Sequence, residues 1–197
     1  MQRLDTQTRQ KQIIDAALIL IKQYGLTGLT IKNLAGQVNI SEQAIYRHFE
    51  NKLAILKALV LYFNQSLHEK LKARGKSDEI LQDIEQIIVG HLEYFAAKPE
   101  MAALVYPEEV FQAEPLISTQ VQETIEKRID TITRIMKQAQ QQGKVAANYS
   151  AENLALIIFG SIRIMITNWR FSGYSFDLVR KGKILANDLL DLIQAKN

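Results

Sequence analysis

The spacing of apolar residues restricts the possible folds of this sequence more than any other feature. Ile13, Ala17 and Ile21 are separated by steps of four, and a longer stripe with helical spacing runs from Leu53 to Leu71. A period of three to four residues places apolar side chains on one face of an α-helix. No segment alternates apolar and polar residues as a half-buried strand would. We therefore expect an all-α protein with about nine helices.

Capping residues, glycines and prolines divide the chain into these expected helices. Thr6 or Thr8 is expected to cap the first helix, which ends at Gly25. Asn51 opens a long fourth helix that ends near Arg74. Further helices are expected at about 30–38, 41–48 and 78–97, from Pro115 to Gly143, at 151–171 with Ser150 as its cap, and from Ser175 onward. Pro99 and Pro107 each stand where a helix could begin.

Composition excludes several classes of protein. The chain has 197 residues and no cysteine, so it holds no disulfide and no cysteine-ligated zinc. The polar first residues contain no apolar core of a secretory signal. The most apolar stretch, Leu154 to Ile166, is interrupted by Gly160 and Arg163, which makes it too short and too polar to span a bilayer. We expect a soluble cytoplasmic protein without a membrane partner.

Charge is distributed unevenly along the chain. Residues 1–76 hold 12 lysines and arginines against 5 acidic residues, whereas residues 77–197 hold 12 against 16. The first part is therefore basic and the second acidic. A basic module is typical of proteins that bind a polyanion, although a solvated lysine-rich surface would have the same composition.

The segment from Thr30 to Lys52 carries the clearest functional pattern. Thr30 and Ser41 can each cap a short helix, and Asn39 lies between them, where a left-handed residue is needed. This arrangement predicts a helix-turn-helix, with the DNA-binding domain over residues 1–52. The residues expected to pack its helices together are Leu34, Ala35, Val38, Ile40, Ile45 and Phe49.

The second helix of this motif would present polar residues to the major groove. Gln43 can pair with an adenine edge, Ala44 can contact a thymine methyl group, and Arg47 can contact a guanine or a phosphate. The capped helix starts at Thr30 and Ser41 would turn backbone N–H groups toward phosphates.

Residues 8–56 resemble the DNA-binding domain of the TetR/AcrR (tetracycline repressor) family. The matching pattern is Thr30, Leu34-Ala35, Ile40-Ser41, Ile45-Tyr46, His48-Phe49 and Lys52. Asn39, Leu29 and Gln43 depart from the residues common in that pattern. The resemblance implies that Tyr46, His48 and Lys52 contact the DNA backbone. Two alternatives remain: Tyr46 can pack on the fourth helix, and His48 can bond within its own helix.

The rest of the chain, residues 53–197, is expected to form a helical ligand-sensing and dimerisation domain, joined to the first domain by the fourth helix at about 51–73. A pocket is expected among its aromatic residues, although such residues also build ordinary cores. Arg163 lies in an otherwise apolar helix and suits either the pocket or a subunit interface. The candidate pocket residues are His91, Tyr94, Tyr106, Phe111, Met136, Phe159 and Arg163.

The last two helices carry more apolar surface than one protomer needs, and Gly160-Ser161 would permit the close approach of a partner. This pattern favours a four-helix bundle between two copies of the chain, although the same helices can simply cover the protomer's own core. The candidate interface residues are Leu154, Ile158, Ser161, Met165, Leu185, Leu189 and Leu192.

We interpret the chain as a ligand-responsive transcriptional regulator, most simply a repressor that an unidentified small molecule releases from a pseudo-palindromic operator. Two alternatives stay open: a helix-turn-helix protein that binds DNA constitutively, and a helical enzyme. The enzyme is disfavoured because the three histidines lack metal-ligand spacing and no phosphate-binding loop or nucleophile elbow is present. No cofactor or metal is expected.

Overall fold

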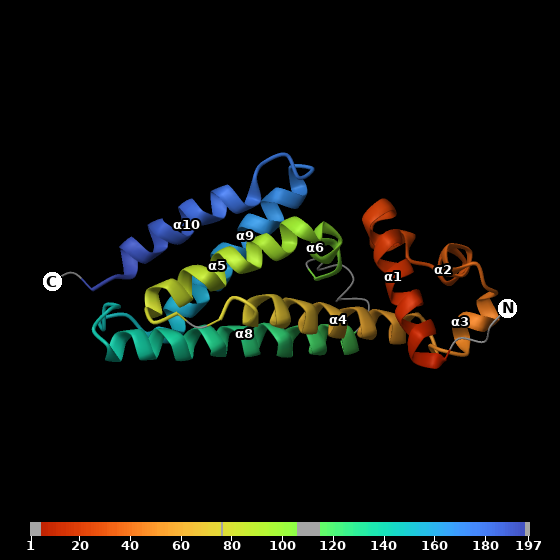
Figure 1. Cartoon of the computed structure of the whole chain (residues 1–197), viewed down its shortest axis with the longest axis horizontal. Helices are drawn as coiled ribbons and strands as arrows, with labels where there is room; N and C mark the ends of the chain where they lie inside the picture. The colour runs from red at the N-terminus through yellow and green to blue at the C-terminus, as the bar shows by residue number, and fades with distance from the viewer. Residues whose placement is uncertain (1–4, 76, 106–114, 196–197) are drawn as a thin grey trace. The chain divides into compact units, whose positions relative to one another are not determined.

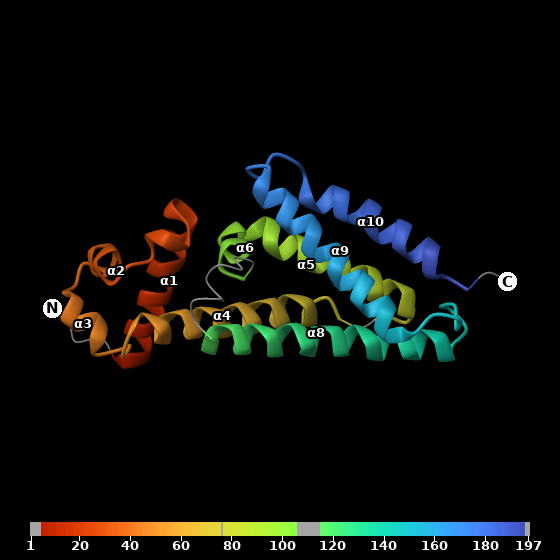
Figure 2. The same cartoon turned by 180° about the vertical axis from the view of Figure 1, so that it is seen from behind.

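A computed structural model describes residues 5–75, 77–105 and 115–195. These residues form nine α-helices and one short 3₁₀ turn, with no strand beyond an isolated bridge between Val145 and Gln194 (Figures 1 and 2). The prediction of an all-α fold is confirmed. The helices are α1 (Thr6–Tyr24), α2 (Ile31–Val38), α3 (Glu42–Tyr46), α4 (Lys52–Lys72), α5 (Ile80–Ala97), α6 (Pro99–Val105), α8 (Pro115–Gln141), α9 (Ala151–Phe171) and α10 (Leu178–Ile193).

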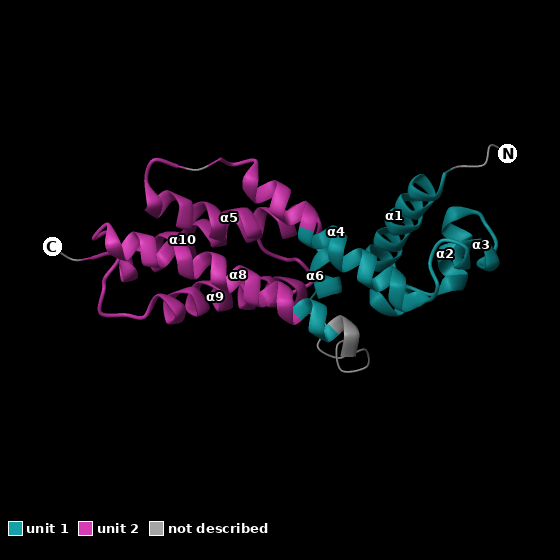
Figure 3. Ribbon diagram, turned by 90° about the horizontal axis from the view of Figure 1, so that it is seen from below, with its two compact units in different colours: residues 1–64, 99–121 teal, residues 65–98, 122–197 magenta. Residues whose placement is uncertain are grey.

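The described residues divide into two compact units (Figure 3). Unit 1 combines residues 1–64 with 99–121, and unit 2 combines residues 65–98 with 122–197. Helix α4 belongs to both units, since its first residues count with unit 1 and its last with unit 2. The expected domain boundary at residue 52 falls at the start of this shared helix.

In unit 1, α1 packs against α2 and α6. The expected stripe of Ile13, Ala17 and Ile21 is buried, as helical periodicity predicts. The cap of α1 differs from the prediction: Asp5, not Thr6 or Thr8, accepts the N–H of Thr8 at 2.9 Å and its hydroxyl at 2.6 Å. The carboxylate of Asp5 therefore begins the helix, because it satisfies a donor that the first turn leaves free.

In unit 2, α5 packs against both α9 and α10. A side chain at Gly182 on α10 would overlap the end of the Leu92 side chain of α5, so glycine favours the close approach of the two helices. The predicted cap at Ser150 is confirmed by its bond to the N–H of Asn153. The last helix begins later than predicted, because Asp177 and not Ser175 accepts the N–H of Arg180.

Helix α9 is 21 residues long and, by length and composition alone, could cross a membrane. This differs from the expectation that the apolar stretch is too short, since the helix continues beyond Leu154 and Ile166 at both ends. Its buried stripe from Ala151 to Trp169 packs within unit 2. Core helices of soluble proteins pass the same test, so the finding is weak evidence for a membrane span.

Candidate DNA-binding surface, pocket and subunit face

The turn between α2 and α3 has the geometry that the sequence predicts. Asn39 adopts the left-handed conformation, with φ 57° and ψ 51°, and its N–H reaches the carbonyls that end α2. Asparagine tolerates this region better than most residues. Leu34 and Ala35 of α2 and Ile45 of α3 are buried, so the two helices pack through the apolar residues expected of them.

Helix α3 presents a polar face because one apolar residue holds it in place. Ile45 is fully buried, whereas Gln43 and Arg47 are exposed and Tyr46 is 49% exposed. The hydroxyl of Ser41 accepts the N–H of Ala44 at 3.2 Å and caps the helix. The helix ends at Tyr46, two residues earlier than predicted, so Arg47 and His48 lie in the turn that follows it.

The remaining candidates for DNA contact lie on both sides of α3. The hydroxyl of Thr30 caps α2 by accepting the N–H of Asn33 at 3.1 Å, and Thr30 is exposed. Lys52 is exposed in the first turn of α4, which Asn51 caps through the N–H of Ala54. Ala44 is half-buried. Thr30, Ser41 and Lys52 thus stand at the starts of three consecutive helices, and each of them is exposed.

His48 is held at its backbone rather than through its ring. Its carbonyl oxygen accepts the side-chain amide of Gln10 at 3.0 Å, which ties the turn after α3 to α1. Within the described residues, the ring Nδ1 of His48 is buried and has no hydrogen-bond partner. The alternative of an intrahelical bond is therefore not what the structure shows. Tyr46 is half exposed, which leaves its outer part accessible to DNA.

The candidate pocket residues mostly lie in the core of unit 2. Tyr94, Met136 and Phe159 are buried, and the hydroxyl of Tyr94 lies 2.5 Å from that of Ser66. Arg163 is half-buried on α9. Two further candidates, Tyr106 and Phe111, lie outside the described residues.

His91 lies on α5, is buried, and faces Arg128 of α8. Its Nδ1 lies 2.7 Å from the carbonyl of Ile87, one turn earlier, and its Nε2 lies 3.3 Å from the guanidinium of Arg128. Burial lowers the pKa of His91 to about 4, and the positive charge of Arg128 acts in the same direction. The neutral imidazole therefore donates from Nδ1 to Ile87 and accepts from Arg128 at Nε2.

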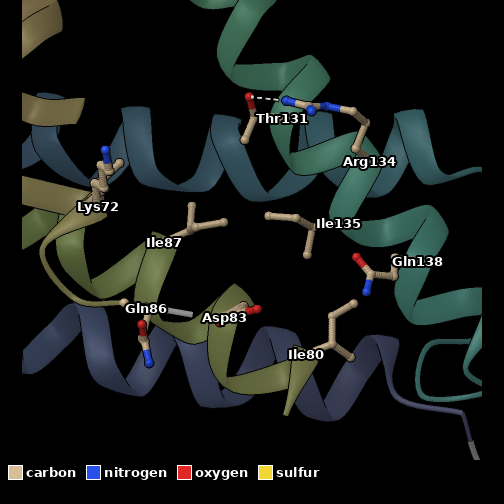
Figure 4. Close-up of a pocket in the computed structure, with 11 residues that line it drawn as sticks. Lys72, Ile80, Asp83, Gln86, Ile87, Thr131, Arg134, Ile135 and Gln138 are labelled. Carbon is tan, nitrogen blue, oxygen red and sulfur yellow. Dashed lines mark hydrogen bonds between the residues drawn. The ribbon is translucent and has the colours of Figure 1, made fainter. Parts of the chain in front are cut away.

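A pocket of about 470 Å³ opens elsewhere in unit 2, and sequence reasoning missed it (Figure 4). No predicted pocket residue lines it. No sequence signal identified it, because its walls come from three helices and a connecting segment that are far apart along the chain. Its lining residues are Leu71, Lys72, Gly75, Ile80, Asp83, Gln86, Ile87, Thr131, Arg134, Ile135 and Gln138.

The candidate interface residues separate into two groups. Leu154, Ile158 and Leu189 are buried in the protomer, where they pack the chain's own core. Their predicted place on the subunit interface is therefore corrected. Ser161, Met165 and Leu185 are half-buried, and Leu192 is exposed. The structure also exposes large apolar residues outside that candidate set, namely Leu156, Ile157, Ile164 and Phe171 on α9 and Ile184 on α10.

Comparison with known proteins gives matches along nearly the whole chain. Residues 13–59 match the model described as bacterial regulatory proteins of the tetR family, and residues 56–194 match that of the YsiA-like protein C-terminal region. The probable acrEF/envCD operon repressor of Escherichia coli K12 is 30% identical over 189 residues, which cover 93% of this chain and 85% of that protein.

Solved structures share the fold. The fatty acid degradation regulator FadR of Bacillus halodurans superposes with a TM-score of 0.82 at 18% identity, over 96% of this chain and 97% of that one. FadR of Bacillus subtilis in complex with stearoyl-CoA superposes with a TM-score of 0.73 at 24% identity, over 92% and 96%.

Proposed function

The chain belongs to the TetR family of bacterial transcriptional regulators, which are not enzymes, and we propose that it is a homodimeric repressor released from its operator by a small molecule. Residues 1–52 would bind the operator, and residues 53–197 would sense the effector and form the dimer. Such a protein works in the cytoplasm, where its DNA lies.

The observation that carries the proposal is the polar face of α3 above the buried Ile45. Gln43 and Arg47 point away from the core, so they are available to base edges and phosphates. Tyr46, His48 and Lys52 would contact the DNA backbone, with Thr30 and Ser41 at the neighbouring helix starts. Ala44 would contact a thymine methyl group.

An open apolar stripe on α9 and α10 supports the homodimer. Ile157 and Ile164 are 53% and 57% exposed and lie seven residues apart, hence on one face of α9. Leu192 is 72% exposed on α10. Large aliphatic side chains exposed on two helices that pack together favour a protein partner over water. Ser161, Met165 and Leu185 would lie within or beside the interface.

Helix α4 is the element through which an effector would act, since its two ends belong to different units. A ligand that prefers one arrangement of α4 would change the fit of two recognition helices to successive grooves. Relatives of this fold bind small molecules; the Bacillus subtilis FadR structure holds stearoyl-CoA. His91, Tyr94, Met136, Phe159 and Arg163 remain candidates for contact with an effector that enters the core.

The test begins with selection of operator sequences by the purified protein. Gln43→Ala should relax the preference at one base pair in each half-site, at a cost of about 1–3 kcal/mol. Lys52→Ala should weaken binding to all sequences equally, because a phosphate contact carries no sequence information. Fluorescence anisotropy on the selected operator and on mismatched versions measures both effects.

Glu79→Ala is the control, because it changes an exposed side chain just before α5, and it should leave the base preference of the protein unaltered. An unchanged sequence profile for Gln43→Ala would reject the proposed orientation of α3. If no small molecule altered the affinity for the operator, the constitutive DNA-binding alternative would replace the repressor.

A further inference from the structure

The pocket of unit 2 has an apolar centre and a polar rim. Ile87 of α5 and Ile135 of α8 point toward one another across it, and Ile80, the first residue of α5, also lines it (Figure 4). A volume of about 470 Å³ lies within the range of sites that bind small molecules. The centre therefore suits the apolar body of a ligand.

Two cations from different helices stand on the rim. Arg134 of α8 donates from Nη2 to the hydroxyl of Thr131 at 3.2 Å, and that hydroxyl donates to the carbonyl of Lys127 at 2.8 Å. This chain of bonds orients the guanidinium on the pocket side of α8 (Figure 4). Lys72 stands on the opposite wall, at the end of α4. Asp83 is the acidic residue of the lining, and its carboxylate accepts the N–H of Ser77 at 2.8 Å.

Two other cations close to Lys72 along the chain are paired with a carboxylate, unlike Lys72 and Arg134. Lys70 and Arg74, on the same stretch of chain as Lys72, both pair with Glu93, at 3.3 and 2.5 Å. These contacts, with the bond from Arg74 first, hold the pKa of Glu93 below its usual range. Within the described part of the chain, no carboxylate lies within ion-pair distance of Lys72 or Arg134.

We propose that this pocket is the effector site and that its ligand is an anionic amphiphile, with its apolar body between Ile87 and Ile135 and its anionic group at Lys72 and Arg134. The inference rests on the proposed function, because it supplies the ligand class for the sensor. Gln86 of α5 and Gln138 of α8 also line the pocket and add amide donors for the head group. A carboxylate or a phosphate ester would satisfy this rim equally well.

Calorimetry on the full-length protein tests the site with three probes of equal chain length: dodecanoate, dodecanoyl-CoA and dodecyltrimethylammonium. Both anions, or the one whose head group fits the rim, should bind about tenfold or more tightly than the cation. Replacement of both rim cations, Lys72→Gln with Arg134→Gln, should remove this advantage. A matched double change on the same unit, Lys137→Gln with Lys144→Gln, should keep it.

A second variant tests the apolar centre independently. Ile135→Trp should fill the pocket and abolish binding of every probe, while circular dichroism reports an intact helical fold. Equal binding of anions and cation, or unchanged anion binding after Lys72→Gln with Arg134→Gln, would overturn the inference. Operator binding measured on the same preparations separates the two proposals: a protein that binds operator but no probe refutes the pocket alone, and one that binds no operator refutes the repressor.

Discussion

Residues 30–52 and the helices α9 and α10 expose opposite kinds of side chain. Between Thr30 and Lys52 the core residues Leu34 and Ile45 are fully buried, whereas Gln43 and Arg47 are exposed. On α9 and α10, Ile157, Ile164 and Leu192 remain in water although a full stripe of each helix is already buried. The first surface suits a hydrated, charged partner, and the second suits another apolar protein surface.

The two surfaces should therefore respond to different conditions. Contacts with phosphates release counterions and weaken strongly as salt rises. Apolar contacts between subunits depend on buried area and are not weakened in this way. Experiments that change salt, apolar area or protonation separately can test whether the comparison holds.

The largest expected effect is that of salt on operator binding. If a dimer neutralises six to ten phosphates, its affinity should fall about a thousandfold or more between 50 and 200 mM salt. Fluorescence anisotropy measures the affinity, and sedimentation of the free protein over the same range serves as the control. A flat salt response would show that the basic first part of the chain does not contact DNA.

The next largest effect is expected from charges placed on the α9 stripe. Ile157→Glu with Ile164→Glu should convert the dimer to monomers, because each glutamate would lose its hydration at the interface. Operator affinity should fall about a hundredfold, since two half-site contacts would no longer be linked. Analytical ultracentrifugation reports the assembly and anisotropy the affinity.

Tyr149→Glu is the matched control for this pair, because Tyr149 is similarly exposed but precedes α9. Leu189→Glu is unsuitable, since Leu189 is buried and its replacement would unfold the protomer. A dimer that survives both glutamates would place the interface on another face.

A smaller effect concerns His91, a polar residue that is buried in unit 2. Its pKa of about 4 lies below the ordinary value of 6.5, so the unfolded chain binds a proton that the folded chain excludes. Stability is therefore full above pH 7 and falls as the pH drops toward 4. His91 should account for about 2 kcal/mol of the loss between pH 7.5 and 5.

Urea unfolding at both pH values measures this loss. His91→Asn keeps a donor for the carbonyl of Ile87 and should reduce the pH dependence by that amount. His68→Asn, at an exposed position on α4, should leave it unchanged. An equal pH dependence in all three proteins would show that His91 is protonated as readily in the fold as in the unfolded chain.

The features predicted correctly are those that depend on neighbouring residues. Thr30, Ser41 and Ser150 cap helices as expected, and Asn39 takes the left-handed turn, because each effect acts over three or four residues. Asp5 was missed because Thr6 and Thr8 were chosen in its place, although aspartate is a stronger N-cap residue than threonine.

Features that depend on distant segments could not be predicted. The spacing of α9 identifies an apolar helix but not which of its apolar faces unit 2 buries, so Leu154 and Ile158 were placed on the wrong side. The pocket joins residues about 50 positions apart, such as Ile87 and Ile135, that no local pattern relates.

Gly182 and Gly160, both in unit 2, should tolerate different substitutions in a random mutagenesis screen. At Gly182 a methyl group would overlap the end of the Leu92 side chain, so alanine there would force this buried side chain to move and would destabilise the protomer. At Gly160 nothing lies within 4 Å of an added methyl group, so alanine would be harmless to the protomer. If α9 meets its counterpart there, larger residues at Gly160 would still be eliminated by selection for repression. A screen that scores abundance and repression separately would thus distinguish a position required for folding from one required for assembly.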